Sequence, residues 1–269
     1  MGLRSIERYN SKVKLEHDYE TIEIGDIGSL LDIFMSLRQQ EFWSFRGQRN
    51  ELWNLGIGHR FTSEETEEDL VIYLQQFRKR CMEFPRPHFI EEFDEWRWLF
   101  YARHHGLKTR LLDWTTNPLV ALYFAVENIV SKGTDKDYVG AVWALKVDQE
   151  NFLSPEHAGP PNELKRWVMI NPPPITARIA RQSGKFSYHP SLDSEPLNRQ
   201  LRRSGKEELV KIVITSEDGT NASQKLRKEL GIMNIHHASL FPGPDGIANF
   251  INHEWPILAL DKHLSSQVI

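Results

Sequence analysis

Cysteine is almost absent from this sequence, since Cys81 is the single thiol among 269 residues. One cysteine excludes a disulfide framework and a cysteine zinc site. Its scarcity is compatible with a reducing cytoplasm, where we expect the protein to act. No apolar run approaches the ~20 residues that a membrane helix needs, and the first residues lack the apolar core of a signal peptide. We therefore expect no membrane association.

Several catalytic signatures are also missing. The chain has no G-x-G-x-x-G dinucleotide fingerprint, no phosphate-binding P-loop and no G-x-S-x-G serine elbow. The histidines occur as the adjacent pairs 104–105 and 236–237, and neighbouring residues on a helix or strand rarely share one metal. We predict no metal site. A formal net charge of -4 argues against general nucleic-acid binding through bulk charge.

The remaining composition is typical of a folded globular chain. It is 40% hydrophobic and 26% charged, and its length suits one large domain or one domain with an added lobe. Eight tryptophans and 14 phenylalanines predict an aromatic-rich core or cleft, because aromatic side chains bury large areas.

Apolar spacing and capping residues predict four helices. One follows Asp26, one follows Thr62 with capping-box spacing to Glu65, one covers residues 91–104, and one covers 119–128. Asn117 and Pro118 are the expected N-cap and first residue of the last helix, which is apolar almost all round and should be buried. The expected buried stripes of the first two are Leu30, Ile33, Phe34 and Leu37, then Leu70, Tyr73, Leu74 and Phe77.

Short apolar runs predict strands between these helices. They cover residues 42–46, 109–112, 138–147 and 211–215, and a further helix over 225–230 should end at Gly231. Helices and strands do not alternate regularly, which favours an α+β domain over a doubly wound sheet.

Two segments carry the most specific signal. They are FRGQ at residues 45–48 and YARHHGLKTRLLDWTTNPLVALYFA at residues 101–125. With them, the sequence resembles the FRG-domain family, and RIARQSGKF at 178–186 and LFPGPDGIA at 240–248 are similar to its closing motifs. The resemblance runs from about residue 42 to 250. We accordingly expect an N-terminal extension with a helix at 1–40, an FRG domain at 41–255 and a C-terminal tail at 256–269.

The order of these motifs distantly resembles the ADP-ribosyltransferase fold. The resemblance implies an α+β, ADP-ribosyltransferase-like mixed core with flanking helices. It matches Arg46 to the arginine of the first core strand, residues 109–116 to a strand rich in hydroxyl groups, and residues 121–125 to the following helix. Gln182 stands where such enzymes usually carry the catalytic glutamate. This departure moves the acidic role to Asp113 or argues against the usual chemistry.

The chemistry of NAD cleavage determines which groups such a site needs. Nicotinamide leaves through an oxocarbenium-like ribose, much as a sugar leaves in glycoside cleavage. The site needs a forked cation for the pyrophosphate, a flat apolar surface for nicotinamide and a hydrogen-bond acceptor near the ribose. We predict Arg46, Gln182 and Asp113 as catalytic residues. The predicted cofactor-binding residues, with NAD as substrate, are Arg46, His105, Thr109, Arg110, Trp114 and Tyr123.

Each of these residues also has a structural interpretation. Arg46 could be a buried partner of Asp113 instead of a phosphate ligand, because a buried charge needs a partner in either case. Asp113 could cap a turn or helix, and His105 could be an ordinary loop histidine beside Gly106. Trp114 and Tyr123 would then be core residues.

Two basic segments complete the candidates. Arg178 and Arg181 flank Gln182 in what we expect to be a basic strand with a central amide, an unusual pattern for packing alone. Residues 199–206 are expected to form an exposed basic loop. Contact between this loop and nucleic acid or an acidic partner is the alternative.

These observations lead to competing functional hypotheses. The first is an NAD-dependent ADP-ribosyltransferase, a toxin or anti-phage effector that modifies a macromolecular acceptor, RNA or protein. The second is a non-catalytic FRG module that binds a nucleotide or a partner such as an antitoxin or chaperone. A third, hydrolysis of NAD, differs only in that water is the acceptor.

Overall fold

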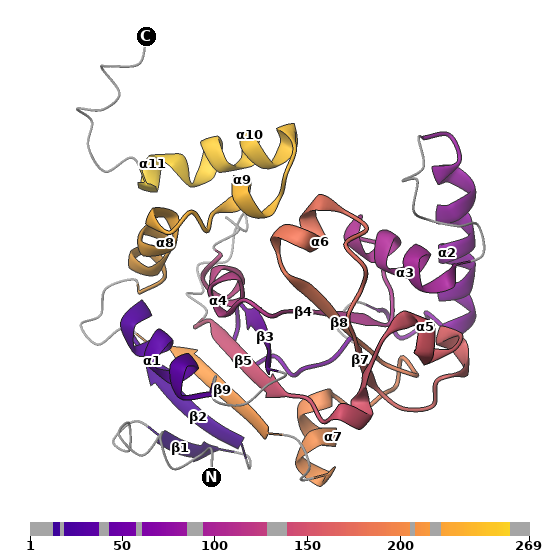
Figure 1. Ribbon diagram of the computed structural model, residues 1–269, viewed down its shortest axis with the longest axis horizontal. Coiled ribbons are helices and arrows are strands. Elements are labelled where there is room, and N and C mark those ends of the chain that lie inside the picture. Colours follow the sequence, from indigo (N-terminus) through magenta and orange to yellow (C-terminus); the bar gives the residue numbers. More distant parts are fainter. Residues whose placement is uncertain are drawn as a thin grey trace. The chain divides into compact units, whose positions relative to one another are not determined.

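The computed structural model describes residues 13–16, 19–37, 43–57, 61–84, 94–127, 139–204, 208–215 and 222–258. The chain is mixed α and β, as the sequence predicts. It divides into two compact units, each built from separated stretches of sequence (Figure 1). Unit 1 consists of Met1–Trp53, Asn117–Ala144 and Val210–Ile269, and unit 2 consists of Asn54–Thr116 and Leu145–Leu209.

Unit 1 combines a mixed sheet with helices from both halves of the sequence. Its strands lie in the order β1-β2-β9-β5-β3, with β1 and β2 antiparallel and β2 and β9 parallel. Its strands are β1 (Val13–Glu16), β2 (Tyr19–Ile24), β3 (Trp43–Gln48), most of β5 (Ala141–Lys146) and most of β9 (Glu208–Ile214). Its helices are α1 (Ile27–Leu37), α4 (Pro118–Val126), α8 (Ala222–Ile232), α9 (His237–Leu240), α10 (Pro244–His253) and α11 (Trp255–Leu258).

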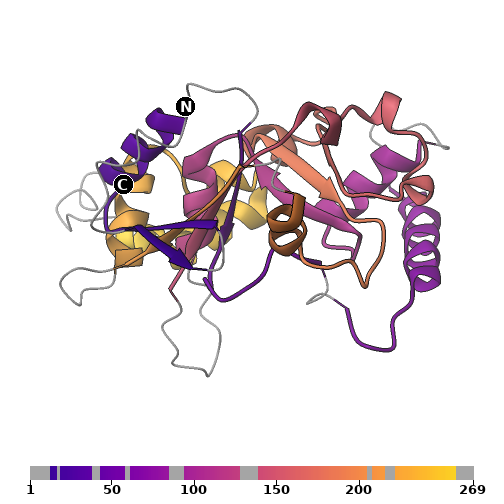
Figure 2. The same ribbon diagram turned by 90° about the horizontal axis from the view of Figure 1, so that it is seen from below.

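The core of unit 1 lies where α1, α4 and α8 meet the sheet. Helix α1 lies against the sheet near β2 and β9 in both views (Figures 1 and 2). Asp26 accepts a hydrogen bond from the backbone of Ser29, so the helix begins where the sequence predicts. The predicted stripe of α1 is buried, and the apolar side chains of α4 join the same cluster.

Helix α4 also begins as predicted, with Asn117 as N-cap and Pro118 as the first helical residue. It runs against β3 with almost no space between the two backbones. A Cβ on Gly47 would lie 1.9 Å from the carbonyl oxygen of Ala121. The glycine of the FRG motif is therefore required by helix packing rather than by an unusual backbone angle.

The strands of unit 2 lie in the order β4-β8-β7-β6. Strand β8 is antiparallel to both β4 and β7, while β6 and β7 are parallel. The strands are β4 (Leu111–Thr115), β6 (Phe152–Leu153), β7 (Val168–Ile170) and β8 (Gly184–Tyr188). The helices are α2 (Glu67–Cys81), α3 (Glu95–His104), α5 (Pro155–Ala158), α6 (Ala177–Arg181) and α7 (Leu197–Ser204), with short 3-10 turns at Gln149–Asn151 and Pro161–Glu163.

The core of unit 2 is aromatic, which confirms the expectation from composition for this unit. Phe100 of α3 stacks on Phe186 of β8 at 5.2 Å between ring centroids. Trp96 meets the ring of Tyr188 edge to face at 5.4 Å. These contacts fix α3 against the sheet, and the carboxyl end of α3 carries the histidines of the second motif.

The structure corrects several predicted boundaries in unit 2. Helix α2 begins after Thr66, whose capping box is with Asp69, whereas Glu65 bonds the backbone of Thr62 ahead of the helix. The predicted stripe of this helix is only partly buried. Strand β4 begins at Leu111, later than predicted, and α3 is described from Glu95 onward. The predicted residues 91–93 lie outside the described part.

Three predicted conformations are wrong. Arg178 and Arg181 belong to the short helix α6, and Gln182 is its C-cap, so this segment is not a strand. The basic residues 199–204 belong to helix α7 rather than to a loop, because Leu197 and Leu201 are buried at helical spacing. Gly231 continues α8, and the left-handed conformation falls on Asn234 instead, with φ 59°.

No described helix combines the length and the apolar character that a membrane span requires. The predicted tail at 256–269 lies largely outside the described residues. The predicted domain boundaries at 40 and 255 remain predictions. Residues 22–37 nevertheless contribute side chains to the core of unit 1.

Candidate functional site

The residues predicted as a site fall into two groups, one in each unit. Arg46 and Tyr123 belong to unit 1. His105, Thr109, Arg110, Asp113, Trp114 and Gln182 belong to unit 2. The structure therefore defines the surroundings of each group separately.

Arg46 lies on β3 between two residues with structural tasks. Phe45 is buried and meets Phe34 of α1 edge to face at 4.8 Å, and Gly47 admits α4. The side chain of Arg46 is half-buried, so it is not sealed inside the core of unit 1. Among Phe45, Arg46 and Gly47, only Arg46 has a charged group that could bind a ligand.

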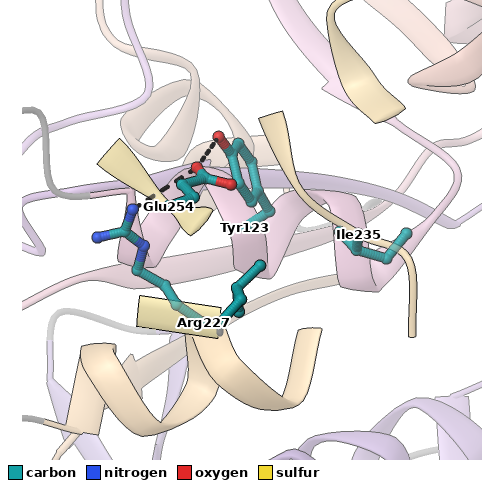
Figure 3. Close-up of a pocket in the computed structure, with 5 residues that line it drawn as sticks. Tyr123, Arg227, Ile235 and Glu254 are labelled. Carbon is teal, nitrogen blue, oxygen red and sulfur yellow. Dashed lines mark hydrogen bonds and ion pairs between the residues drawn. The ribbon is translucent and has the colours of Figure 1, made fainter. Parts of the chain in front are cut away.

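Tyr123 occupies a different environment from the one predicted. Its side chain is 1% exposed and its hydroxyl donates to Glu254 at 2.8 Å (Figure 3). His237 Nδ1 lies 3.1 Å from the same hydroxyl, and Arg227 lies 3.6 Å from Glu254. The buried ring and the engaged hydroxyl favour the structural interpretation of Tyr123, and its role as a stacking surface remains a prediction.

Tyr123, Arg227 and Glu254 line a small pocket that is partly open to solvent, together with Ile235 and Leu258 (Figure 3). Burial, with the carboxylates of Glu127 and Glu254, raises the pKa of Tyr123 far above its ordinary value of 10.0. The phenol therefore stays protonated and acts as a hydrogen-bond donor. Sequence reasoning missed Glu254 and Arg227, because each lies more than 100 positions from Tyr123.

Asp113 projects from β4 and is held by Arg103 of α3. Arg103 Nε donates to the two carboxylate oxygens at 3.1 and 3.2 Å, and Nη2 donates to Oδ2 at 2.6 Å. The side chain of Asp113 is 44% exposed, while that of Arg103 is 19% exposed. The pair orients a carboxylate that solvent still reaches. Sequence reasoning did not identify Arg103, although it is part of the second motif.

The two histidines at the end of α3 differ in exposure. His105 is exposed, whereas His104 is half-buried and its Nδ1 lies 3.1 Å from Thr176 Oγ1. Arg178 of α6 donates to the carbonyl of His104 at 3.2 Å. Burial, together with the positive charges of Arg178 and His105, lowers the pKa of His104 to about 4. Burial and Arg178 also lower the pKa of His105.

Three other predicted ligand-binding residues are occupied by local contacts. Thr109 is 2% exposed and its hydroxyl accepts a hydrogen bond from the backbone of Leu111. Trp114 is 3% exposed and donates to Ser187 at 2.9 Å. Arg110 donates to the carbonyl of Pro190 at 2.6 Å, bonds Glu67, and lies over the ring of Tyr188. These contacts favour the structural interpretation of the three residues, and their roles as ligand contacts remain predictions.

Gln182 closes helix α6 immediately before β8. Its backbone carbonyl accepts a hydrogen bond from the hydroxyl of Thr115 at 2.6 Å. Ser183 follows with φ 47°, a conformation uncommon outside glycine, and its carbonyl accepts from the backbone of Thr116. These two hydrogen bonds join the end of β4 to the segment before β8, so the backbone of Gln182 has a fixed position. Its side chain is a neutral amide. Among the described residues, no group of three or more potential metal ligands comes together.

Comparison with known families confirms the resemblance inferred from sequence. Residues 41–133 match the model of the FRG domain, and they include both the FRGQ motif and the segment 101–125. The chain therefore carries an FRG domain over these residues, roughly a third of its length. The two later motifs, at 178–186 and 240–248, lie outside the match. No curated protein and no solved structure matches the chain.

Proposed function

We propose that the protein is an NAD-dependent ADP-ribosyltransferase that modifies a macromolecular acceptor, as a toxin or anti-phage effector would. The observation that carries this proposal is the position of Arg46. It is the half-buried charged residue on β3, between a core phenylalanine and a glycine that admits α4. A guanidinium held on a rigid strand suits the pyrophosphate of NAD, because its forked donors match phosphate oxygens.

The reaction would proceed by breaking the bond between the ribose and nicotinamide. The bonding electron pair leaves with nicotinamide, and a nucleophile of the acceptor bonds the ribose carbon and loses a proton. Positive charge develops on the ribose in between, so a nearby anion lowers the barrier. Of the two predicted candidates, Asp113 can supply that charge, whereas the neutral amide of Gln182 can only form hydrogen bonds.

The position of Asp113 supports this choice. Its carboxylate is oriented by three hydrogen bonds from Arg103 and is still 44% exposed. A catalytic group held in one orientation by a second side chain is the arrangement that preorganised sites use. The proposal therefore assigns the acidic role to Asp113 and a hydrogen-bonding role to Gln182.

The experiment that tests this proposal follows radiolabelled NAD incubated with a cell lysate and the purified chain. We expect label to enter a macromolecule with the wild type and with Arg49→Ala, a control on the neighbouring arginine, but not with Arg46→Ala. Digestion of the product with ribonuclease or protease identifies the acceptor as RNA or protein. Equal labelling by wild type and Arg46→Ala would contradict the role of Arg46. Labelled free ADP-ribose without a labelled macromolecule would identify water as the acceptor.

One set of observations favours a second function, a non-catalytic binding module. Tyr123, Trp114 and Thr109 are all buried and engaged in local contacts, and the usual acid is replaced by Gln182. Expression in bacteria separates the two functions. A transferase acting as a toxin arrests growth, and Arg46→Ala relieves the arrest. A binding module expressed at the same level leaves both growth and cellular NAD unchanged.

A further inference from the structure

The carboxyl end of α3 and helix α6 bring three nitrogen-rich side chains together within unit 2. Arg178 Nη1 donates to the carbonyl of His104 at 3.2 Å, and the rings of His104 and His105 lie 4.7 Å apart. Thr176, the N-cap of α6, contacts His104 Nδ1 at 3.1 Å. His105 is exposed, and His104 and Arg178 are half-buried, so solvent reaches the group.

The charges that act on these imidazoles are positive. Arg178 disfavours the protonated form of both histidines, and His105 does the same to His104. Asp113 of β4, a carboxylate that contacts α3, is engaged by Arg103 of the same helix. The rings of Phe77 and Tyr101 also lie beside His105 and carry no charge at neutral pH. An anion placed among the three groups would favour the protonated imidazoles that Arg178 disfavours.

We propose that His104, His105 and Arg178 form a binding site for a phosphate group of a nucleotide. Phosphate oxygens only accept hydrogen bonds, and a guanidinium together with protonated imidazoles only donates them, so the two sets are complementary. The inference rests on the proposed function for the source of the phosphate. The phosphate group would belong either to the diphosphate of the dinucleotide or to a phosphodiester of an RNA acceptor.

Proton uptake is the distinctive consequence of this site. Without an anion, the histidines are neutral at pH 7, because burial and Arg178 lower the pKa of each. A bound phosphate favours the protonated forms, so binding and protonation promote each other. ADP-ribose is a suitable probe, because the diester-like diphosphate has no ionisation in the range where histidine titrates. We expect its affinity to increase as the pH falls from 7.5 to about 5.

The test combines calorimetry with NMR titration of the imidazoles in the full chain, using ADP-ribose and, separately, a short single-stranded RNA. We expect a bound probe to raise the pKa of both histidines. We expect Arg178→Gln or His105→Gln to weaken binding about 10-fold or more, and Arg178→Lys to restore part of it. Lys165→Gln and His157→Gln remove an exposed charge and an exposed imidazole elsewhere in unit 2 and serve as controls.

The outcomes show whether the site binds phosphate and which molecule supplies it. A shift with ADP-ribose assigns the site to the dinucleotide, and a shift with RNA alone assigns it to an acceptor phosphodiester. Imidazole resonances that move with neither probe, or an affinity for both probes that Arg178→Gln changes no more than Lys165→Gln does, would overturn the site. Nicotinamide release that depends on Arg46 would stand in that event. Loss of that release together with intact phosphate binding would instead remove only the proposed reaction.

Discussion

Arg103 and Asp113 form a bidentate ion pair that joins helix α3 to strand β4. Nε and Nη2 of the arginine contact both carboxylate oxygens at 2.6 to 3.2 Å. The nine residues between them contain the exposed turn at His105 and Gly106. This pair gives Asp113 a fixed orientation and leaves part of its carboxylate open to solvent. It therefore combines a structural role with the catalytic role that we propose.

Replacing Asp113 by asparagine separates these two roles. The substitution keeps the shape of the side chain but removes the charge that Arg103 binds. We expect a loss of about 1 to 2 kcal/mol in the free energy of unfolding, measured by urea denaturation. Asp193→Asn, at an exposed turn of the same unit, should cost less. If Asp113 is also the catalytic anion, the folded variant will release nicotinamide at least 100-fold more slowly. Unchanged release would reassign the acidic role.

Gly47→Ala tests the requirement for glycine in the FRG motif. The new Cβ would lie 1.9 Å from the carbonyl oxygen of Ala121 and 2.7 Å from the nitrogen of Ala125, so α4 must move away from β3. We expect a loss of about 3 kcal/mol in the free energy of unfolding. The control is Gly56→Ala, whose Cβ would meet its nearest neighbour at an ordinary 3.7 Å. Similar melting temperatures for both variants would contradict the close approach of α4.

Tyr123→Phe tests the contact between α4 and the C-terminal helices of unit 1. The substitution removes the hydroxyl that donates to the buried carboxylate of Glu254. We expect a loss of about 1 to 3 kcal/mol in the free energy of unfolding. Tyr73→Phe removes a hydroxyl that bonds Glu65 at a more exposed position, and should cost less.

The raised pKa of Tyr123 adds a pH dependence with a defined sign. Above pH 10 the unfolded chain ionises this tyrosine while the folded chain keeps it protonated. Stability should therefore fall as the pH rises above 10, and less steeply in Tyr123→Phe. An ultraviolet titration that detects ionisation of Tyr123 near pH 10 in the folded protein would contradict this environment.

His104 gives the opposite dependence, in acid. Its pKa falls from 6.5 to about 4 in the folded chain, so the unfolded chain binds the proton first as the pH decreases. Stability should rise between about pH 4 and 6.5, and His104→Gln should flatten this rise. The measurement is urea denaturation across that range, with His157→Gln as the exposed control. An NMR titration of His104 with its midpoint near 6.5 would refute the buried environment.

Local patterns in the sequence predicted much of the secondary structure. The N-cap at Asp26 and the pair Asn117 and Pro118 place α1 and α4 correctly, because a cap and an apolar stripe are specified by residues within one or two turns. Helix α6 was not predicted, because its five residues give no periodic signal. Helix α7 was mistaken for a loop because its arginines outnumber its two buried leucines.

The candidate site was predicted only in part. The motif identified Arg46, Asp113 and His105, whose charged or polar side chains are half-buried or exposed. It could not show that Thr109 and Trp114 are occupied by their own strand neighbours, since their partners depend on the register of β4 and β8. The contact between Tyr123 and Glu254 joins residues 131 positions apart, and no local pattern encodes such a pair.

Release of nicotinamide from NAD by the purified chain tests the central claim most directly, with the variants Arg46→Lys, Arg46→Ala and Arg49→Ala compared at matched folding. We predict that Arg46→Ala loses at least 100-fold in rate while circular dichroism and melting temperature stay close to those of the wild type. Arg46→Lys should recover only part of the rate, because a lysine cannot form the forked contact. Nicotinamide release by Arg46→Ala at the rate of the wild type would contradict the assignment of this arginine to the dinucleotide.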